Sequence, residues 1–85
     1  MLYRQIVLDC TELEAPEPMN LVVGNLSRCD DSTYIKMIHR LKPEPLIAIL
    51  SKNNFESKAV QNGDGFIIYI WLANQKHLKE YIKSL

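Results

Sequence analysis

The tripeptide Pro-Glu-Pro stands at residues 16–18 and again at residues 43–45, and the two copies contain all four prolines of this 85-residue chain. Proline is accepted in the first turn of a helix, where its missing N–H group is not needed. It also disfavours helical geometry in the residue before it. Each copy therefore predicts the start of a helix.

Apolar periodicity supports a helix after each copy. The spacing i, i+3, i+4 and i+7 follows the first copy and begins again after the second, in Met19, Val22, Val23 and Leu26 and then in Leu46, Ile49 and Leu50. Asn53-Asn54 predicts a left-handed end to the second helix. Gly24, in the middle of the first helix, is expected to let that helix approach a sheet closely.

Strand-like segments surround the two helices. Residues 3–10 and 33–40 precede them and are rich in β-branched and aromatic side chains, while residues 55–61 and 66–72 flank the turn sequence Asn62-Gly63-Asp64-Gly65. The predicted order is βαβαββ. This order is typical of an α/β (α+β) two-layer sandwich, with a mixed four-stranded sheet and both helices on one face.

The last predicted strand, residues 66–72, is apolar on both faces, so its second face needs a cover. Residues 74–85 offer one, because their apolar side chains follow a helical stripe made of Leu78, Tyr81, Ile82 and Leu85. We therefore expect a domain over residues 1–73 and an amphipathic helix over residues 74–85. That helix packs either on its own sheet or at a homodimer contact, which leaves monomer and homodimer both open.

Composition narrows the class of protein. Ten basic residues balance ten acidic ones, which argues against a nucleic-acid partner. The longest apolar run, residues 66–73, has eight residues and is too short to cross a membrane as a helix. The first residues lack the apolar stretch of a secretory signal, so a cytoplasmic protein with two reduced cysteines, Cys10 and Cys29, is expected.

The segment LDCTELEAPEP, residues 8–18, resembles the signature of the TusA/SirA-like sulfur-carrier superfamily. In that superfamily a strand ends in Leu-Asp, a short loop follows, and a Cys-Pro-x-Pro motif opens the first helix. The resemblance covers about residues 5 to 71. It implies the same βαβαββ topology and says nothing about the tail helix.

Two positions depart from the superfamily pattern. Ala15 stands where the sulfur carriers have the cysteine that holds a persulfide, and Glu12 replaces a usual loop glycine. The second phrase, HRLKPEPL at residues 39–46, is similar to a cysteine-lacking, uncharacterised branch of the superfamily. That branch has no settled role, but a scaffold that keeps the fold without the persulfide cysteine predicts a non-enzymatic module that binds a protein partner or a small anion. The alternative is a sulfur carrier, or sulfurtransferase, that uses Cys10.

Five residues are candidates for ligand or partner binding. Parallel strands finish at the same edge of a sheet, and ligands tend to sit beyond those ends, beside helix N-termini. The strand-end and helix-start residues at this edge are Asp9, Cys10, Glu17, His39 and Arg40. Arg40 suits an anion, or alternatively pairs with Glu12, Glu17 or Glu44.

The other candidate roles have structural alternatives. Cys10 follows apolar strand residues and is expected to be a buried structural thiol more than a reactive one. His39 is expected to be a solvated or hydrogen-bonded residue at the end of a strand. No catalytic set, metal-ligand spacing or phosphate-binding glycine loop is present in the sequence, so no cofactor is expected.

Overall fold

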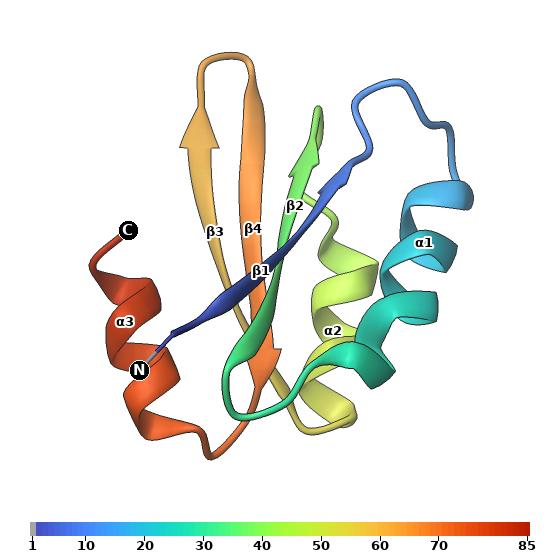
Figure 1. Ribbon diagram of the computed structural model, residues 1–85. Helices are drawn as coiled ribbons and strands as arrows, with labels where there is room; N and C mark the ends of the chain where they lie inside the picture. Colours follow the sequence, from blue (N-terminus) through green and yellow to red (C-terminus); the bar gives the residue numbers. More distant parts are fainter. Residues whose placement is uncertain (1) are drawn as a thin grey trace.

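The computed structural model describes residues 2–85, and its elements follow the order that the prolines and glycines predict (Figure 1). In chain order they are β1 (Arg4–Asp9), α1 (Glu17–Asn25), the short 3-10 helix η1 (Leu26–Arg28), β2 (Thr33–His39), α2 (Glu44–Lys52), β3 (Phe55–Asn62), β4 (Gly65–Leu72) and α3 (Lys76–Lys83). Both helices that follow Pro-Glu-Pro begin at the glutamate of the phrase, as predicted.

The four strands form one mixed sheet in the order β1-β2-β4-β3. β1 runs parallel to β2, and β4 is antiparallel to both of its neighbours. In Figure 1, α1 and α2 cover one face of the sheet and α3 lies on the other. The fold class predicted from the sequence is therefore confirmed.

Local backbone geometry matches two of the predictions made from turn residues and contradicts a third. Asn54, just beyond α2, has a φ of 65°, and Gly63 in the two-residue turn between β3 and β4 has a φ of 61°. Both lie in the left-handed region that asparagine and glycine tolerate best. The expectation for Gly24 is wrong, because a Cβ built there would meet nothing within 4 Å.

Side chains of the sheet alternate between two apolar clusters. The cluster under α1 and α2 contains Leu8, Cys10, Val22, Cys29, Ile35, Met37, Leu46, Leu50, Ile68 and Ile70. The alternation predicted for β4 is confirmed, because Ile68 and Ile70 belong to this cluster while Tyr69 and Trp71 face the other way.

The second cluster lies between the sheet and α3. Leu78 and Ile82 of α3 are fully buried against Tyr34, Tyr69 and Trp71 of the sheet. Tyr81 also stacks on Tyr3, with 4.2 Å between the ring centroids. In this structure α3 therefore covers the second face of its own sheet. Within residues 2–85, no helix is long and apolar enough to cross a membrane.

Candidate functional site: a pocket between the two Pro-Glu-Pro copies

β1 and β2 end at the same edge of the sheet, and both lead directly to a helix start. The register pairs Asp9 with Ile38, and the N–H of Cys10 extends the ladder by donating to the carbonyl of Ile38 at 2.7 Å. The loops that leave this edge carry the two Pro-Glu-Pro copies into α1 and α2 (Figure 1). Residues 9–18 and 39–46, here called the contact edge, thus lie together although they are far apart in the chain.

Asp9 shapes the loop after β1. Its carboxylate accepts hydrogen bonds from the hydroxyl of Thr11 at 2.6 Å and from the N–H of Thr11 at 3.0 Å. These two bonds favour the charged form and lower the pKa of Asp9. The side chain is exposed, so its charge also reaches solvent at the contact edge.

Cys10 is a buried thiol. Its side chain is 0% exposed and its Sγ lies 3.8 Å from the carbonyl of Leu8. Burial raises the pKa of Cys10, and the neighbouring charge of Asp9 raises it further. A reactive cysteine needs the thiolate form and access to its reaction partner. Neither condition is favoured at this position.

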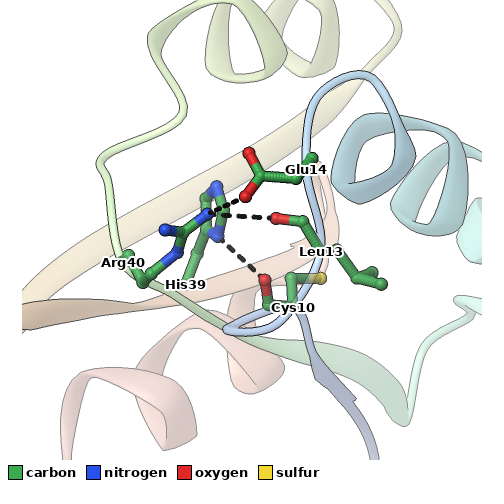
Figure 2. Close-up of polar contacts among 5 residues, drawn as sticks. All are labelled: Cys10, Leu13, Glu14, His39 and Arg40. Carbon is green, nitrogen blue, oxygen red and sulfur yellow. Dashed lines mark hydrogen bonds and ion pairs between the residues drawn. The ribbon is translucent and has the colours of Figure 1, made fainter.

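His39 is 9% exposed and lies on the same face of the sheet as the buried Met37, two residues before it in β2. Its Nδ1 lies 3.2 Å from the carbonyl oxygen of Cys10 (Figure 2). A carbonyl can only accept, so Nδ1 carries the hydrogen and donates it. In the neutral ring Nε2 is then left as a hydrogen-bond acceptor.

Arg40 holds the loop between β1 and α1. Its Nη2 donates to the carbonyl of Leu13 at 3.3 Å and lies 3.4 Å from the Glu14 carboxylate (Figure 2). Glu14 was not among the three glutamates expected as partners of Arg40. The reason is that the carbonyl of Leu13 and the side chain of Glu14 become neighbours only when the loop folds back over the end of β2.

A pocket of about 290 Å³ opens where the two helix starts meet, and both Pro-Glu-Pro copies line it. Apart from His39 and Lys42 its walls are apolar; they comprise Ala15, Pro16, Pro18, Met19, Met37, Leu41, Pro43, Pro45 and Leu46. Met37 and Leu46 are fully buried, whereas Leu41 is 67% exposed at the rim. Sequence reasoning missed Leu41 and Lys42, although an apolar residue directly after Arg40 in a polar loop was a visible signal.

Only one of the five candidate residues, His39, lines this pocket. Arg40 instead lines a second, more polar hollow of about 230 Å³ near the β3–β4 turn, together with Thr11, Asn62 and Asp64, and His39 lines this hollow as well. Glu17 is exposed at the start of α1. The structure therefore brings the five residues to one edge but does not converge them on one point.

The two helix starts have few N–H groups free for an anion. Proline occupies an early position in each helix, so Pro18 and Pro45 contribute no N–H there. The N–H of Glu17 already donates to the carbonyl of Glu14 at 2.9 Å, and the N–H of Glu44 donates to the carbonyl of Lys42 at 3.0 Å. Each glutamate also places a negative charge beside the positive end of its helix.

The charge of the contact edge is negative although the whole chain is neutral. Residues 9–18 and 39–46 carry five carboxylates and two cations, so their formal charge is −3 with His39 neutral. Both cations already form ion pairs: Arg40 pairs with Glu14, and Lys42 pairs with Glu44 at 3.3 Å. In the part of the chain that the structure describes, Glu12 and Glu17 form no ion pair.

Metal ligands do not converge at the contact edge or elsewhere in residues 2–85, where no group of three or more His, Cys, Asp or Glu residues could hold a metal ion. Comparison with known proteins adds no assignment: no family model, no curated protein and no solved structure matches the chain.

Proposed function

We propose that this chain is a non-enzymatic binding or adaptor module on a TusA-like scaffold, acting in the cytoplasm and contacting a protein partner through residues 9–18 and 39–46. The observation that supports this most directly is the apolar pocket of about 290 Å³ between the two helix starts. Pockets lined by apolar side chains with a few polar groups are the usual places where proteins take up ligands or partner side chains.

A small anion, the other ligand class expected from the sequence, has less support. Proline and internal hydrogen bonds remove most of the N–H donors at the two helix starts. Arg40 and Lys42 are already paired with glutamates, and the contact edge has a formal charge of −3. An anion would therefore approach a negative surface with few free donors.

The alternative function, a sulfur carrier that uses Cys10, has less support from the geometry of that thiol. Its side chain is fully buried and its pKa is raised, whereas persulfide transfer requires an accessible thiolate. Incubation with a cysteine desulfurase and cysteine, followed by mass spectrometry, is expected to leave Cys10 unmodified. A gain of one sulfur atom on Cys10 would instead promote the sulfur-carrier function.

Partner capture with paired variants tests the proposed surface. Leu41→Asp places a charge at the rim of the pocket. Leu85→Asp is the control, because it makes the same change at an exposed leucine beyond α3. The tagged chain and both variants are expressed in cells, and the co-purified proteins are quantified by mass spectrometry. We expect Leu41→Asp to lose partners that wild type and Leu85→Asp retain.

Substitutions at the charged residues of the contact edge extend the same test. Arg40→Ala frees the loop that Arg40 holds, and Glu17→Ala removes a carboxylate that has no ion-pair partner among the described residues, so both should weaken capture of the same partners. Titration with phosphate and sulfate, followed by ¹H–¹⁵N NMR, should leave the amides of the contact edge unshifted. Equal capture by all variants would discard the surface, and saturable phosphate shifts there would replace the protein partner with an anion.

A further inference from the structure

His39 has a free hydrogen-bond acceptor and borders both the apolar pocket and the more polar hollow beside it. Its Nδ1–H is used by the carbonyl of Cys10 at 3.2 Å, which leaves Nε2 without a partner among the described residues. His39 is 9% exposed and lines the pocket with Met37 and Leu46, both fully buried. A ligand that fills the pocket without donating a hydrogen bond would bury this nitrogen unpaired, which is unfavourable.

The pocket is large enough to hold one large side chain. Its volume of about 290 Å³ lies just below the range for small-molecule sites, roughly 300–1,000 Å³. Its apolar walls favour an apolar body, and the Nε2 of His39 favours a hydrogen-bond donor attached to that body. A phenol has this arrangement, because its hydroxyl is at the tip of the ring.

The surface around the pocket favours positive charge in the rest of the ligand. The contact edge has a formal charge of −3, and its carboxylates at Glu12 and Glu17 form no ion pair within residues 2–85. Complementary charge steers association and selects against wrong partners. A segment with lysine or arginine on each side of the inserted ring therefore matches this surface, and an acidic segment does not.

We propose that the pocket binds the tyrosine side chain of a basic segment in a partner protein, with the phenolic O–H donating to Nε2 of His39. This inference rests on the proposed function, which supplies the protein partner. It names the residue that enters the pocket and the sign of the charge that surrounds that residue. Leu41, exposed at the rim, packs against the aromatic ring.

Short peptides test the contribution of the hydroxyl group to binding separately from that of the aromatic ring. The ¹⁵N-labelled full chain is titrated with acetylated and amidated Lys-Tyr-Lys, Lys-Phe-Lys and Glu-Tyr-Glu, and amide shifts are followed by NMR. We expect Lys-Tyr-Lys to shift the amides of Met19, Leu41 and Leu46 and to bind about five- to tenfold more tightly than Lys-Phe-Lys. Glu-Tyr-Glu should bind more weakly than Lys-Tyr-Lys, with the difference shrinking at high salt.

The ring of His39 provides two direct readouts. In the wild-type chain, the ¹⁵Nε2 signal of His39 should shift when Lys-Tyr-Lys binds and stay in place with Lys-Phe-Lys. His39→Phe keeps an aromatic ring and removes the acceptor, so it should bind the two lysine peptides equally. The wild-type measurement decides the matter if the variant does not fold.

The outcomes separate this inference from the proposed function. Equal affinity of the wild-type chain for the tyrosine and phenylalanine peptides, or tighter binding of Glu-Tyr-Glu, would overturn the inference. If no peptide binds while Leu41→Asp still abolishes partner capture, the tyrosine assignment fails and the proposed function stands. If Leu41→Asp leaves capture unchanged as well, both fail.

Discussion

Replacing Leu78 by alanine tests whether α3 is part of the folded unit. Leu78 is fully buried, and with Ile82 it covers the aromatic face formed by Tyr34, Tyr69 and Trp71. Leucine to alanine removes three carbon atoms from this contact and leaves a cavity behind. If α3 packs on its own sheet as in the structure, the change should destabilise the whole domain.

The expected loss is about 3 kcal/mol. Three buried carbon atoms correspond to about 2.4 kcal/mol of transfer free energy at about 0.8 kcal/mol each. The cavity adds to this, and measured Leu→Ala changes in cores range from about 2 to 5 kcal/mol. We expect the lower part of this range, because α3 is a short helix on the outside of the fold and can settle into the space. For a domain of this size the melting temperature should fall by roughly 12–24 °C.

Fluorescence of Trp71 provides the assay, because it is the only tryptophan of the chain and is 4% exposed beneath α3. Urea unfolding is followed by this fluorescence and by circular dichroism, at two protein concentrations. Leu85→Ala is the matched control: Leu85 is 48% exposed, so its truncation should cost less than about 1 kcal/mol. The two probes should report one transition with the same midpoint at both concentrations.

Two results would refute this reasoning. A loss below about 0.5 kcal/mol for Leu78→Ala, no larger than that for Leu85→Ala, would mean that α3 does not bury Leu78 in solution. A midpoint that rises with protein concentration would mean that a second chain covers the aromatic face of the sheet. The second result would restore the homodimer contact that the sequence left open.

Three further substitutions test the geometry at other places. Gly24→Ala should stabilise the chain by about 0.5–1 kcal/mol in urea unfolding, because Gly24 is helical and a Cβ there meets nothing within 4 Å. A loss of stability would contradict the open space around Gly24. Gly65→Ala should destabilise it by about 1–3 kcal/mol, because the Cβ would lie 2.7 Å from the carbonyl oxygen of His39, and a neutral effect would show that β4 does not pass so close to β2. Burial, reinforced by Asp30 and opposed by Arg28, raises the pKa of Cys29 to about 11, so this thiol stabilises the fold below about pH 8.5 and loses that contribution as the pH rises toward 11. Between those pH values the unfolding free energy of wild type should fall more steeply than that of Cys29→Ala, and parallel curves would argue against a buried thiol.

The sequence by itself determined the elements and their order. Proline fixes its own φ and lacks an N–H, so the two Pro-Glu-Pro copies marked the helix starts, and Gly63 and Asn54 marked positions that need positive φ. Alternation in residues 66–72 showed that both faces of β4 are buried. These signals are local, because they depend on backbone geometry and side-chain spacing within a few residues.

Only the tertiary structure decided the character of the contact edge. From the sequence, the two helix N-termini and Arg40 suggested an edge suited to an anion. The N–H groups of Glu17 and Glu44 are nevertheless used in hydrogen bonds that depend on how the loops fold. The Arg40–Glu14 pair and the pocket likewise join residues about 26 positions apart. Such contacts arise from the parallel pairing of β1 with β2, and spacing along the chain does not encode which side chains that pairing brings together.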